Sequence, residues 1–181
     1  IQHNSDLLLT LVGDILSAAE LESNRYTMKI APHSCNKLCR EAITTVEHRK
    51  PEGVKLYYTS EVDDCYELIT DGQRVCQILI NFLTNAEKHT TQGEIRLHCS
   101  LTENPGYVTF SVTDTGTGIP PEYSETIFER FEKADSFGQG TGLGLNICRL
   151  IAERLKGKVL LDKEYKEGAR FVFVLPVKKS I

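Results

Sequence analysis

Residues 81–90, NFLTNAEKHT, place two amides and an ammonium on one face of an expected helix. Asn81, Asn85 and Lys88 are spaced by four and three residues, which brings their side chains to the same side. The amide oxygen of Asn85 is a hard ligand that suits a Mg²⁺ ion bridging phosphates, and Lys88 can contact those phosphates as a point charge. From this helix alone, the row fits either a solvated edge or the wall of a Mg²⁺-phosphate site.

A carboxylate ends the strand expected at YVTFSVTD, residues 107–114. Val108, Phe110 and Val112 share one phase of the alternation and Asp114 continues it, so the pattern predicts that Asp114 is buried. A buried carboxylate costs free energy unless a hydrogen-bond donor pairs with it. The donor is either a backbone N–H of the protein or a ligand such as an adenine amine.

Two glycine-rich segments follow, DTGTGI at 114–119 and GTGLGL at 140–145. Glycine-rich turns that lead into a helix favour phosphates, because the backbone can approach closely and free N–H groups and the helix dipole attract anions. Neither segment has the context of a dinucleotide fingerprint or the G-K-S/T ending of a Walker loop. Together with Asp114 and the Asn85 face, these turns predict a Mg·ATP site.

Hydrophobic periodicity predicts the elements that hold these residues. Helices with one apolar face are expected at 33–48, at 71–89 and from GTGLGL to a cap at Gly157. The strands are short alternating or apolar runs bounded by turn residues. They are expected at 26–32, 54–62, 66–70, 94–101, 107–114, 158–162 and 169–177. The remaining connection, 115–141, has the length of a binding loop or lid.

The N-terminal residues show the spacing of a helical-bundle or coiled-coil seam. The seam consists of Leu8, Leu11, Ile15 and Ala18. The pattern stops after residue 22, so we expect a boundary near residue 25 that separates 1–25 from a domain at 26–181. The first helix then resembles a part of another module, which needs partner helices.

Composition fits a globular protein of 181 residues, with 40% hydrophobic and 25% charged residues. The net charge of −4 and the dispersed basic residues argue against nucleic-acid binding. No apolar run approaches the roughly 20 residues that span a bilayer, and no signal peptide is visible. Because the sequence does not begin with Met, we expect a piece of a longer protein, with any membrane anchor outside it.

The six cysteines include no C-x-x-C pair and fall mostly at apolar positions. They are predicted to be reduced core residues of a cytosolic protein. Cys35 and Cys39, one helical turn apart, are an alternative pair of metal ligands, although no second pair with zinc-site spacing is visible.

From about residue 26 to 177 the sequence resembles the catalytic ATP-binding domain of sensor histidine kinases of two-component systems, within the family that also holds DNA gyrase B, Hsp90 and MutL. NFLTNAEKHT resembles the N box, DTGTGI the first glycine box, IFERFEKAD the F box and GTGLGL the second glycine box. The resemblance implies an α+β fold, a two-layer α/β sandwich with a mixed, mainly antiparallel sheet of about five strands packed on three helices. This is the Bergerat ATP-binding fold, here with an added N-terminal helix. Residues 1–24 resemble the second helix of the dimerisation and phosphoacceptor hairpin.

The resemblance assigns roles by position. Asn85 matches the Mg²⁺ ligand, Asp114 the adenine-recognising aspartate, and Asn81 and Lys88 the residues that face or contact the phosphates. Arg130 and Lys133 match basic lid residues that approach the γ-phosphate, although Arg is common at the second position, and His89 departs from a frequent aromatic residue. The other expected nucleotide-binding residues are Gly116, Gly118, Ile119, Phe131, Gly140, Thr141, Gly142, Leu143 and Gly144.

The ATP-hydrolysing branches of the family place a water-activating Glu where this chain has Asn81, and an amide cannot take a proton at neutral pH. The resemblance therefore implies transfer of the γ-phosphate of Mg·ATP to a histidine, mainly by positioning and charge neutralisation. None of the five histidines fits the His-Glu-Leu/Ile/Phe acceptor pattern, so the acceptor is expected on a helix outside this sequence.

The partners that the resemblance implies are the phosphoacceptor helix of the same or a partner chain, a homodimer in the full-length protein, and the receiver domain of a response regulator. The implied location is cytoplasmic. A non-catalytic nucleotide-sensing module and a gyrase-like ATPase are the alternatives.

Overall fold

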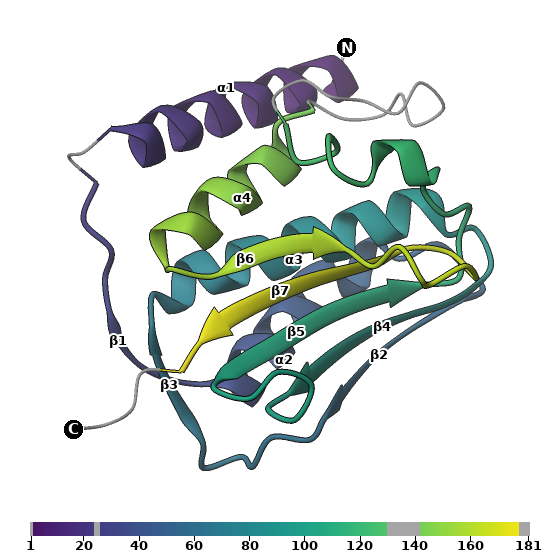
Figure 1. Ribbon diagram of the computed structural model, residues 1–181. Helices are drawn as coiled ribbons and strands as arrows, with labels where there is room; N and C mark the ends of the chain where they lie inside the picture. Colours follow the sequence, from purple (N-terminus) through teal and green to yellow (C-terminus); the bar gives the residue numbers. More distant parts are fainter. Residues whose placement is uncertain (1, 24–25, 130–141, 178–181) are drawn as a thin grey trace.

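A computed structural model describes residues 2–23, 26–129 and 142–177 of the chain (Figure 1). Within these residues, five strands form one sheet in the order β2-β4-β5-β7-β6. The strands are β2 (Val54–Ser60), β4 (Gly93–Ser100), β5 (Tyr107–Asp114), β6 (Lys158–Leu161) and β7 (Arg170–Pro176). β2 runs parallel to β4 and the other neighbours pair antiparallel, which confirms the predicted mixed, mainly antiparallel sheet.

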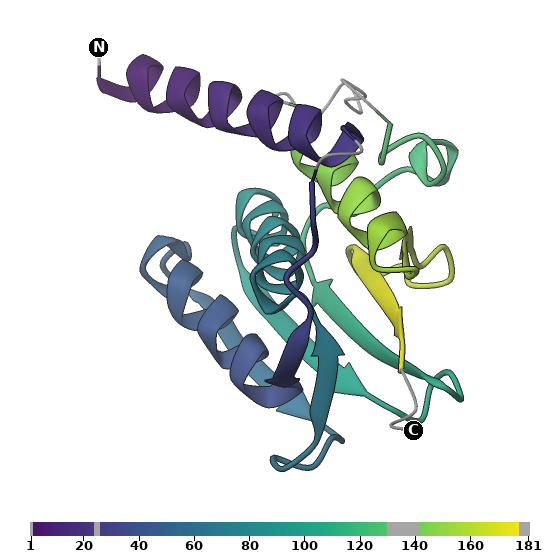
Figure 2. The same ribbon diagram turned by 90° about the vertical axis from the view of Figure 1, so that its left-hand side faces the viewer.

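Three helices, α2 (Cys35–Val46), α3 (Gly72–His89) and α4 (Gly144–Arg154), cover one face of this sheet (Figure 2). The core lies between the two layers, where Phe82 stacks on Phe171 at a centroid distance of 5.2 Å and Phe110 on Phe173 at 5.8 Å. Short 3-10 turns occur at Glu47–Arg49 (η1) and Pro121–Tyr123 (η2). The arrangement is the predicted two-layer sandwich.

The central helix α3 begins where the sequence predicts. The side chain of Asp71 accepts a hydrogen bond from the backbone N of Arg74 at 3.2 Å, which caps the first turn. The apolar side chains that recur at helical spacing along it are all buried: Val75, Ile78, Leu79, Phe82 and Ala86. The burial of this stripe fixes the rotation of α3, and with it the direction in which the polar row of the helix faces.

The first strand and the start of the second helix differ from the prediction. The strand expected at 26–32 is β1 (Ala31–Ser34), which pairs antiparallel with β3 (Glu67–Thr70) in a separate two-stranded sheet. Pro32 was expected to end the strand but lies inside it, because a two-stranded sheet consists of edge strands and these tolerate proline. Ser34 caps α2 by accepting from the backbone N of Lys37 at 3.3 Å, so the helix begins at Cys35 rather than at residue 33.

The end of α4 also differs from the expected glycine cap. The residue with a left-handed backbone is Lys156, with φ of 63°, and not Gly157. Glycine is required at 157 for a different reason, because a Cβ there would lie 2.4 Å from the carbonyl oxygen of Val174. The apolar face of the helix is buried and consists of Leu143, Ile147, Ile151 and Leu155.

The N-terminal helix α1 (Gln2–Glu22) packs on α4, with Ala18 and Leu21 buried in the contact (Figure 1). The guanidinium of Arg154 donates to the carbonyl oxygens of Leu21 and of Ser23, the latter at 2.9 Å, and so caps the C-terminus of α1. Of the expected seam, Ala18 is buried and Ile15 is about half exposed, while Leu8 and Leu11 lie outside the residues whose side chains are described. The boundary near residue 25 stays a prediction.

The six thiols are free, as expected. Cys35, Cys39, Cys99 and Cys148 are buried, Cys76 is half-buried, and Cys65 is exposed and therefore not a core residue. Among the described residues, no group of three or more His, Cys, Asp or Glu side chains has a metal-binding arrangement, which leaves the Cys35–Cys39 alternative without further ligands. None of the described helices is both long and apolar enough to cross a bilayer.

Candidate functional site

The helix that carries the amide row touches the start of α4. The side-chain nitrogen of Asn81 donates to the carbonyl oxygen of Gly144 at 3.3 Å, although the two residues are 63 positions apart. A Cβ on Gly144 would lie 3.4 Å from the Asn81 amide oxygen, so the contact is close on both sides. The structure thus brings together two motifs that the sequence analysis assigned to one site.

Asn85 lies one turn beyond Asn81 and is half-buried. Within the described part of the chain its amide makes no hydrogen bond, so its oxygen can serve an external partner such as a metal ion. Lys88 is exposed at the end of the same row. Desolvation lowers the pKa of the Lys88 ammonium. The Asp14 carboxylate raises this pKa and the Arg49 guanidinium lowers it, both by smaller amounts. A bound phosphate would favour the charged ammonium.

Asp114 is buried as predicted, with 2% of its surface exposed. Its Oδ1 accepts from the backbone N of Gly116 at 2.9 Å and of Ala169 at 3.3 Å. Burial nevertheless raises the pKa of the Asp114 carboxyl, while these two backbone hydrogen bonds lower it. No hydrogen bond from a described residue reaches Oδ2. Both donors that the sequence analysis considered therefore fit the structure: backbone N–H groups bond to Oδ1, and Oδ2 can accept from a ligand.

The turn after Asp114 requires glycines for steric reasons. A Cβ on Gly116 would lie 2.2 Å from the carbonyl oxygen of His89, at the end of α3. Gly118 has φ of 71°, and a Cβ there would lie 3.0 Å from the carbonyl oxygen of Gly168. The turn 116–118 therefore passes in close contact between the end of α3 and the loop that joins β6 to β7.

His89 is half-buried beside this turn. Desolvation, and to a smaller extent the neighbouring Lys88, lowers the pKa of the His89 imidazole. The ring is therefore neutral at pH 7 and can lie against an uncharged base without the cost of desolvating a charge.

The start of α4 has the features of an anion site. Gly142 takes a left-handed φ of 70°, and no side chain caps the helix at Leu143. The N–H groups of the first turn and the helix dipole therefore favour a negative charge near Gly144, where Asn81 also lies. This geometry supports the predicted phosphate cradle.

The histidine kinase-, DNA gyrase B-, and HSP90-like ATPase family matches residues 70–179, which include all the residues of this site. The chain belongs to this family. Its membership of an ATPase family supports the predicted ATP site, whereas the Mg²⁺ ion stays a prediction.

Relatives in this family are sensor kinases. The autoinducer 2 sensor kinase/phosphatase LuxQ of Vibrio harveyi is 34% identical over 190 residues, which cover 97% of this chain and 22% of LuxQ. The chain thus spans about a fifth of the length of that curated relative.

The solved structures of histidine kinases have the same fold. Full-length ShkA in complex with AMPPNP superposes with a TM-score of 0.86 at 32% identity, covering 98% of this chain and 37% of ShkA. The nucleotide-free catalytic domain of ThkA gives 0.72 at 29% identity, covering 83% of this chain and 99% of that domain. ThkA in complex with the response regulator protein TrrA superposes with a TM-score of 0.78 at 27% identity, covering 98% of this chain and 49% of that ThkA chain. These matches confirm the predicted α+β fold and the assignment to histidine kinase catalytic domains.

Five of the predicted site residues lie outside the described part of the chain, and their roles stay predictions. They are Arg130, Phe131, Lys133, Gly140 and Thr141. The described part of the predicted lid ends at residue 129 and is anchored to the sheet, because Phe128 is buried edge-on against Phe171 at a centroid distance of 6.1 Å. Ile119 is half-buried at the start of the lid.

The sequence analysis missed three contributors to the family site. Ala169 donates its backbone N–H to Asp114, and a Cβ on Gly168 would lie 2.1 Å from the Asp114 carbonyl oxygen. Thr90 is fully buried next to Gly116, and its hydroxyl has no hydrogen bond to a described residue. Among these residues, only Gly168 could have been noticed in the sequence, because a glycine just before an apolar strand can indicate a close backbone contact. Ala169 acts through its backbone, which leaves no side-chain pattern to read.

Proposed function

We propose that this chain is the ATP-binding catalytic domain of a sensor histidine kinase, which transfers the γ-phosphate of Mg·ATP to a histidine on a dimerisation helix. The contact of Asn81 with Gly144 carries the proposal. It sets an amide, and not a carboxylate that could deprotonate water, beside the predicted phosphate cradle. The kinase names of the relatives support the same reaction class.

Each described residue then has a defined task. Asp114 accepts the adenine amine on its free Oδ2, and the neutral His89 and the apolar Ile119 lie beside the base. Asn85 supplies an oxygen to Mg²⁺, which neutralises charge on the phosphates when bound. Lys88 and the first turn of α4, with Gly142 and Gly144, hold the phosphate oxygens. Positioning and charge neutralisation account for the transfer.

The partners belong to the same proposal. The acceptor histidine lies on a helix outside this sequence, in the same or a partner chain of a homodimer, and residues 1–25 form the second helix of that hairpin. Residues 115–141 form the ATP lid of the domain at 26–181. The phosphate then passes to the receiver domain of a response regulator, and the kinase domain works in the cytoplasm. The complex of the related ThkA with a response regulator protein supports this arrangement.

Labelled ATP and a separate phosphoacceptor hairpin from the full-length protein test the proposal. Incubation of the chain with both should give acid-labile, alkali-stable phosphate on the hairpin histidine, and the chain alone should stay unlabelled. Tight ATP binding without transfer would instead support a nucleotide-sensing module. Sustained release of phosphate without any acceptor would support a gyrase-like ATPase. An Asp114→Asn chain serves as the control, since at an ATP concentration that half-saturates the parent it should bind and transfer much less.

A further inference from the structure

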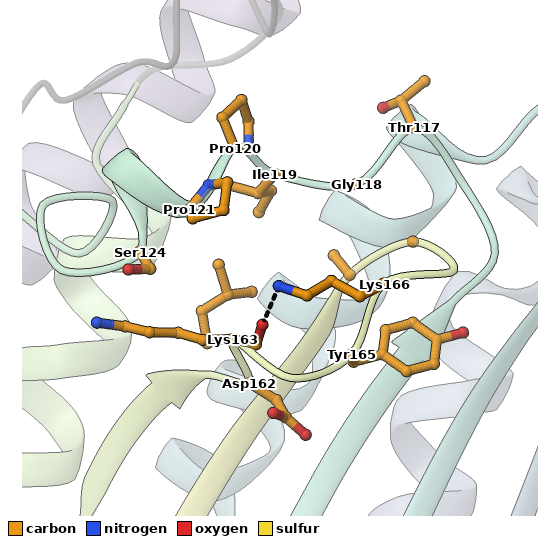
Figure 3. A pocket seen from close by; sticks show the side chains of 13 residues that line it. Thr117, Gly118, Ile119, Pro120, Pro121, Ser124, Asp162, Lys163, Tyr165 and Lys166 are labelled. Carbon is orange, nitrogen blue, oxygen red and sulfur yellow. Dashed lines mark hydrogen bonds between the residues drawn. The ribbon is translucent and has the colours of Figure 1, made fainter.

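A cavity of about 280 Å³ lies beside the nucleotide site, between the start of the lid and the loop that joins β6 to β7 (Figure 3). Residues 117–121 and Ser124 form one side, and residues 161–163, Tyr165, Lys166, Gly168 and Ala169 form the other. The volume is near the lower end of the range for small-molecule pockets.

The cavity is separate from the proposed nucleotide site. None of its described lining residues belongs to α3 or α4; it shares Gly118 and Ile119 with the predicted nucleotide-binding set, and Gly168 and Ala169 with the residues that contact Asp114. The turn 116–118 forms the partition, because Gly116 packs against the His89 carbonyl on the α3 side and Gly118 against the Gly168 carbonyl on the cavity side. A ligand in the cavity therefore does not need the adenine or phosphate positions.

The walls provide an apolar surface with a polar rim. Ile119, Pro120 and Pro121 (Figure 3) line the cavity from the lid, and Leu161, which is 8% exposed, lines it from β6. The ring of Tyr165 closes the side next to the loop. A small apolar body can be buried here, at a gain of about 25 cal/mol per Å² of apolar surface removed from water.

The rim carries one ammonium whose charge is not balanced. Asp162 pairs with Arg170 at 3.2 Å, and Lys163 pairs with Glu125 at 2.8 Å. Lys166 donates to the carbonyl oxygen of Lys163 (Figure 3), and no carboxylate of a described residue pairs with it. The acidic neighbours of Lys166 in the loop, at 164 and 167, do not line the cavity. The unpaired ammonium has two further N–H donors for an anionic group.

We propose that this cavity binds a small amphipathic anion, with an apolar body of one or two rings and a single carboxylate or sulfonate that pairs with Lys166. The apolar walls hold the body and Lys166 selects the charge. The proposal does not depend on the proposed kinase reaction, so a binding measurement tests it separately.

The probe is naphthalene-1-sulfonate, titrated into the whole chain at saturating Mg·ATP. It should bind with saturation and one-to-one stoichiometry, and backbone amide resonances of residues 117–124 and 161–169 should shift. Lys166→Glu should weaken binding by about tenfold, since a rim attraction becomes a repulsion of similar size. Lys37→Glu, the same change at an exposed lysine of α2, should leave the affinity unchanged.

The neutral probe naphthalene has the same rings without the sulfonate. It should bind more weakly than the anionic probe, and Lys166→Glu should not change its affinity. In a parallel titration without nucleotide, displacement of the bound anionic probe when Mg·ATP is added, with probe-induced resonance shifts at residues 85–89, would place it in the nucleotide site and overturn the proposal. Equal affinity of the anionic probe for the parent and Lys166→Glu chains would also overturn it.

Discussion

The side chain of Asn81 holds the carbonyl of Gly144 at 3.3 Å, and this bond joins the middle of α3 to the first turn of α4. Because α3 is fixed by its buried stripe, the bond also fixes where the N-terminus of α4 lies relative to Asn85 and Lys88. The metal-binding and phosphate-binding parts of the proposed site therefore have a defined relative position. Little conformational freedom remains to be lost in them when a nucleotide binds.

Asp114→Asn should weaken adenine-nucleotide binding by about 10- to 100-fold, because a charged acceptor of a hydrogen bond is replaced by a neutral amide. Calorimetry with a non-hydrolysable ATP analogue measures the loss. Asp63→Asn is the matched control, since Asp63 is an exposed residue whose Oδ1 caps the backbone N of Cys65 at 2.7 Å and an amide oxygen can do the same. Equal affinities of both variants and the parent would contradict the assignment of Asp114 to the adenine.

The same variant should be more stable than the parent at neutral pH. The pKa of the Asp114 carboxyl is raised by burial, so the folded chain binds this proton more tightly than the unfolded chain does. The charge therefore destabilises the fold as the pH rises above the ordinary value of 3.8, and fully so above the raised pKa. Melting curves should show a higher Tm for Asp114→Asn at pH 7 and a smaller gap as the pH falls. A lower Tm for the variant at pH 7 would be the opposite outcome.

Asn85→Ala should remove mainly the part of the nucleotide affinity that depends on Mg²⁺, since the alanine offers no oxygen to the metal. Titrations with and without Mg²⁺ separate this part from the rest. Thr84→Ala is the control on the same helix, because the Thr84 hydroxyl bonds to the Ile80 carbonyl of its own helix at 2.9 Å. If Mg²⁺ improved binding to the Asn85→Ala chain as much as to the parent, Asn85 would not be the ligand.

Gly116→Ala should lower the free energy of unfolding by about 1 to 3 kcal/mol, because the new Cβ must push the turn away from the His89 carbonyl. Nucleotide binding should weaken with it, since the turn borders the base. Thermal melting and calorimetry measure the two effects. Gly13→Ala in α1 is the control, because a Cβ at Gly13 meets no atom within 4 Å and alanine favours a helix. An unchanged Tm for Gly116→Ala would show that the turn relaxes freely.

Arg154→Ala should loosen the last turn of α1, because it removes the donor to the Leu21 and Ser23 carbonyls. The cost of a lost cap of this kind is about 1 kcal/mol. Hydrogen exchange of the amides of residues 18–23 should become faster, while that of α3 stays the same. Arg149→Ala, on the same helix, removes a partly exposed side chain with ion pairs to Glu129 and Glu153 and should leave hydrogen exchange in α1 unchanged. Protection of residues 18–23 equal to the parent's would contradict the capping role.

The sequence predicts those parts of the structure that depend on a local period. The apolar face of α3 and the buried phase of Asp114 follow from side chains that repeat every three to four or every two residues. The first strand, expected at 26–32, lies at Ala31–Ser34, because a proline in an edge strand leaves no periodic signal, whereas β3 lies within its predicted range. The contact of Asn81 with Gly144 depends on how α3 and α4 pack, and only the family resemblance anticipated it. The contribution of Ala169 is invisible because a backbone N–H is common to nearly all residue types.

Helix α4 has a different partner at each end. The carbonyl of its first residue, Gly144, accepts a hydrogen bond from Asn81, and the guanidinium of its last residue, Arg154, donates to the carbonyls of Leu21 and Ser23 at the end of α1. The helix of 11 residues is a stiff rod about 16 Å long, at 1.5 Å per residue. A displacement of α1 therefore either breaks the hydrogen bonds of Arg154 or moves α4 as a rigid body. Movement of α4 would shift Gly144 against Asn81, the side chain that borders the phosphates of the proposed nucleotide.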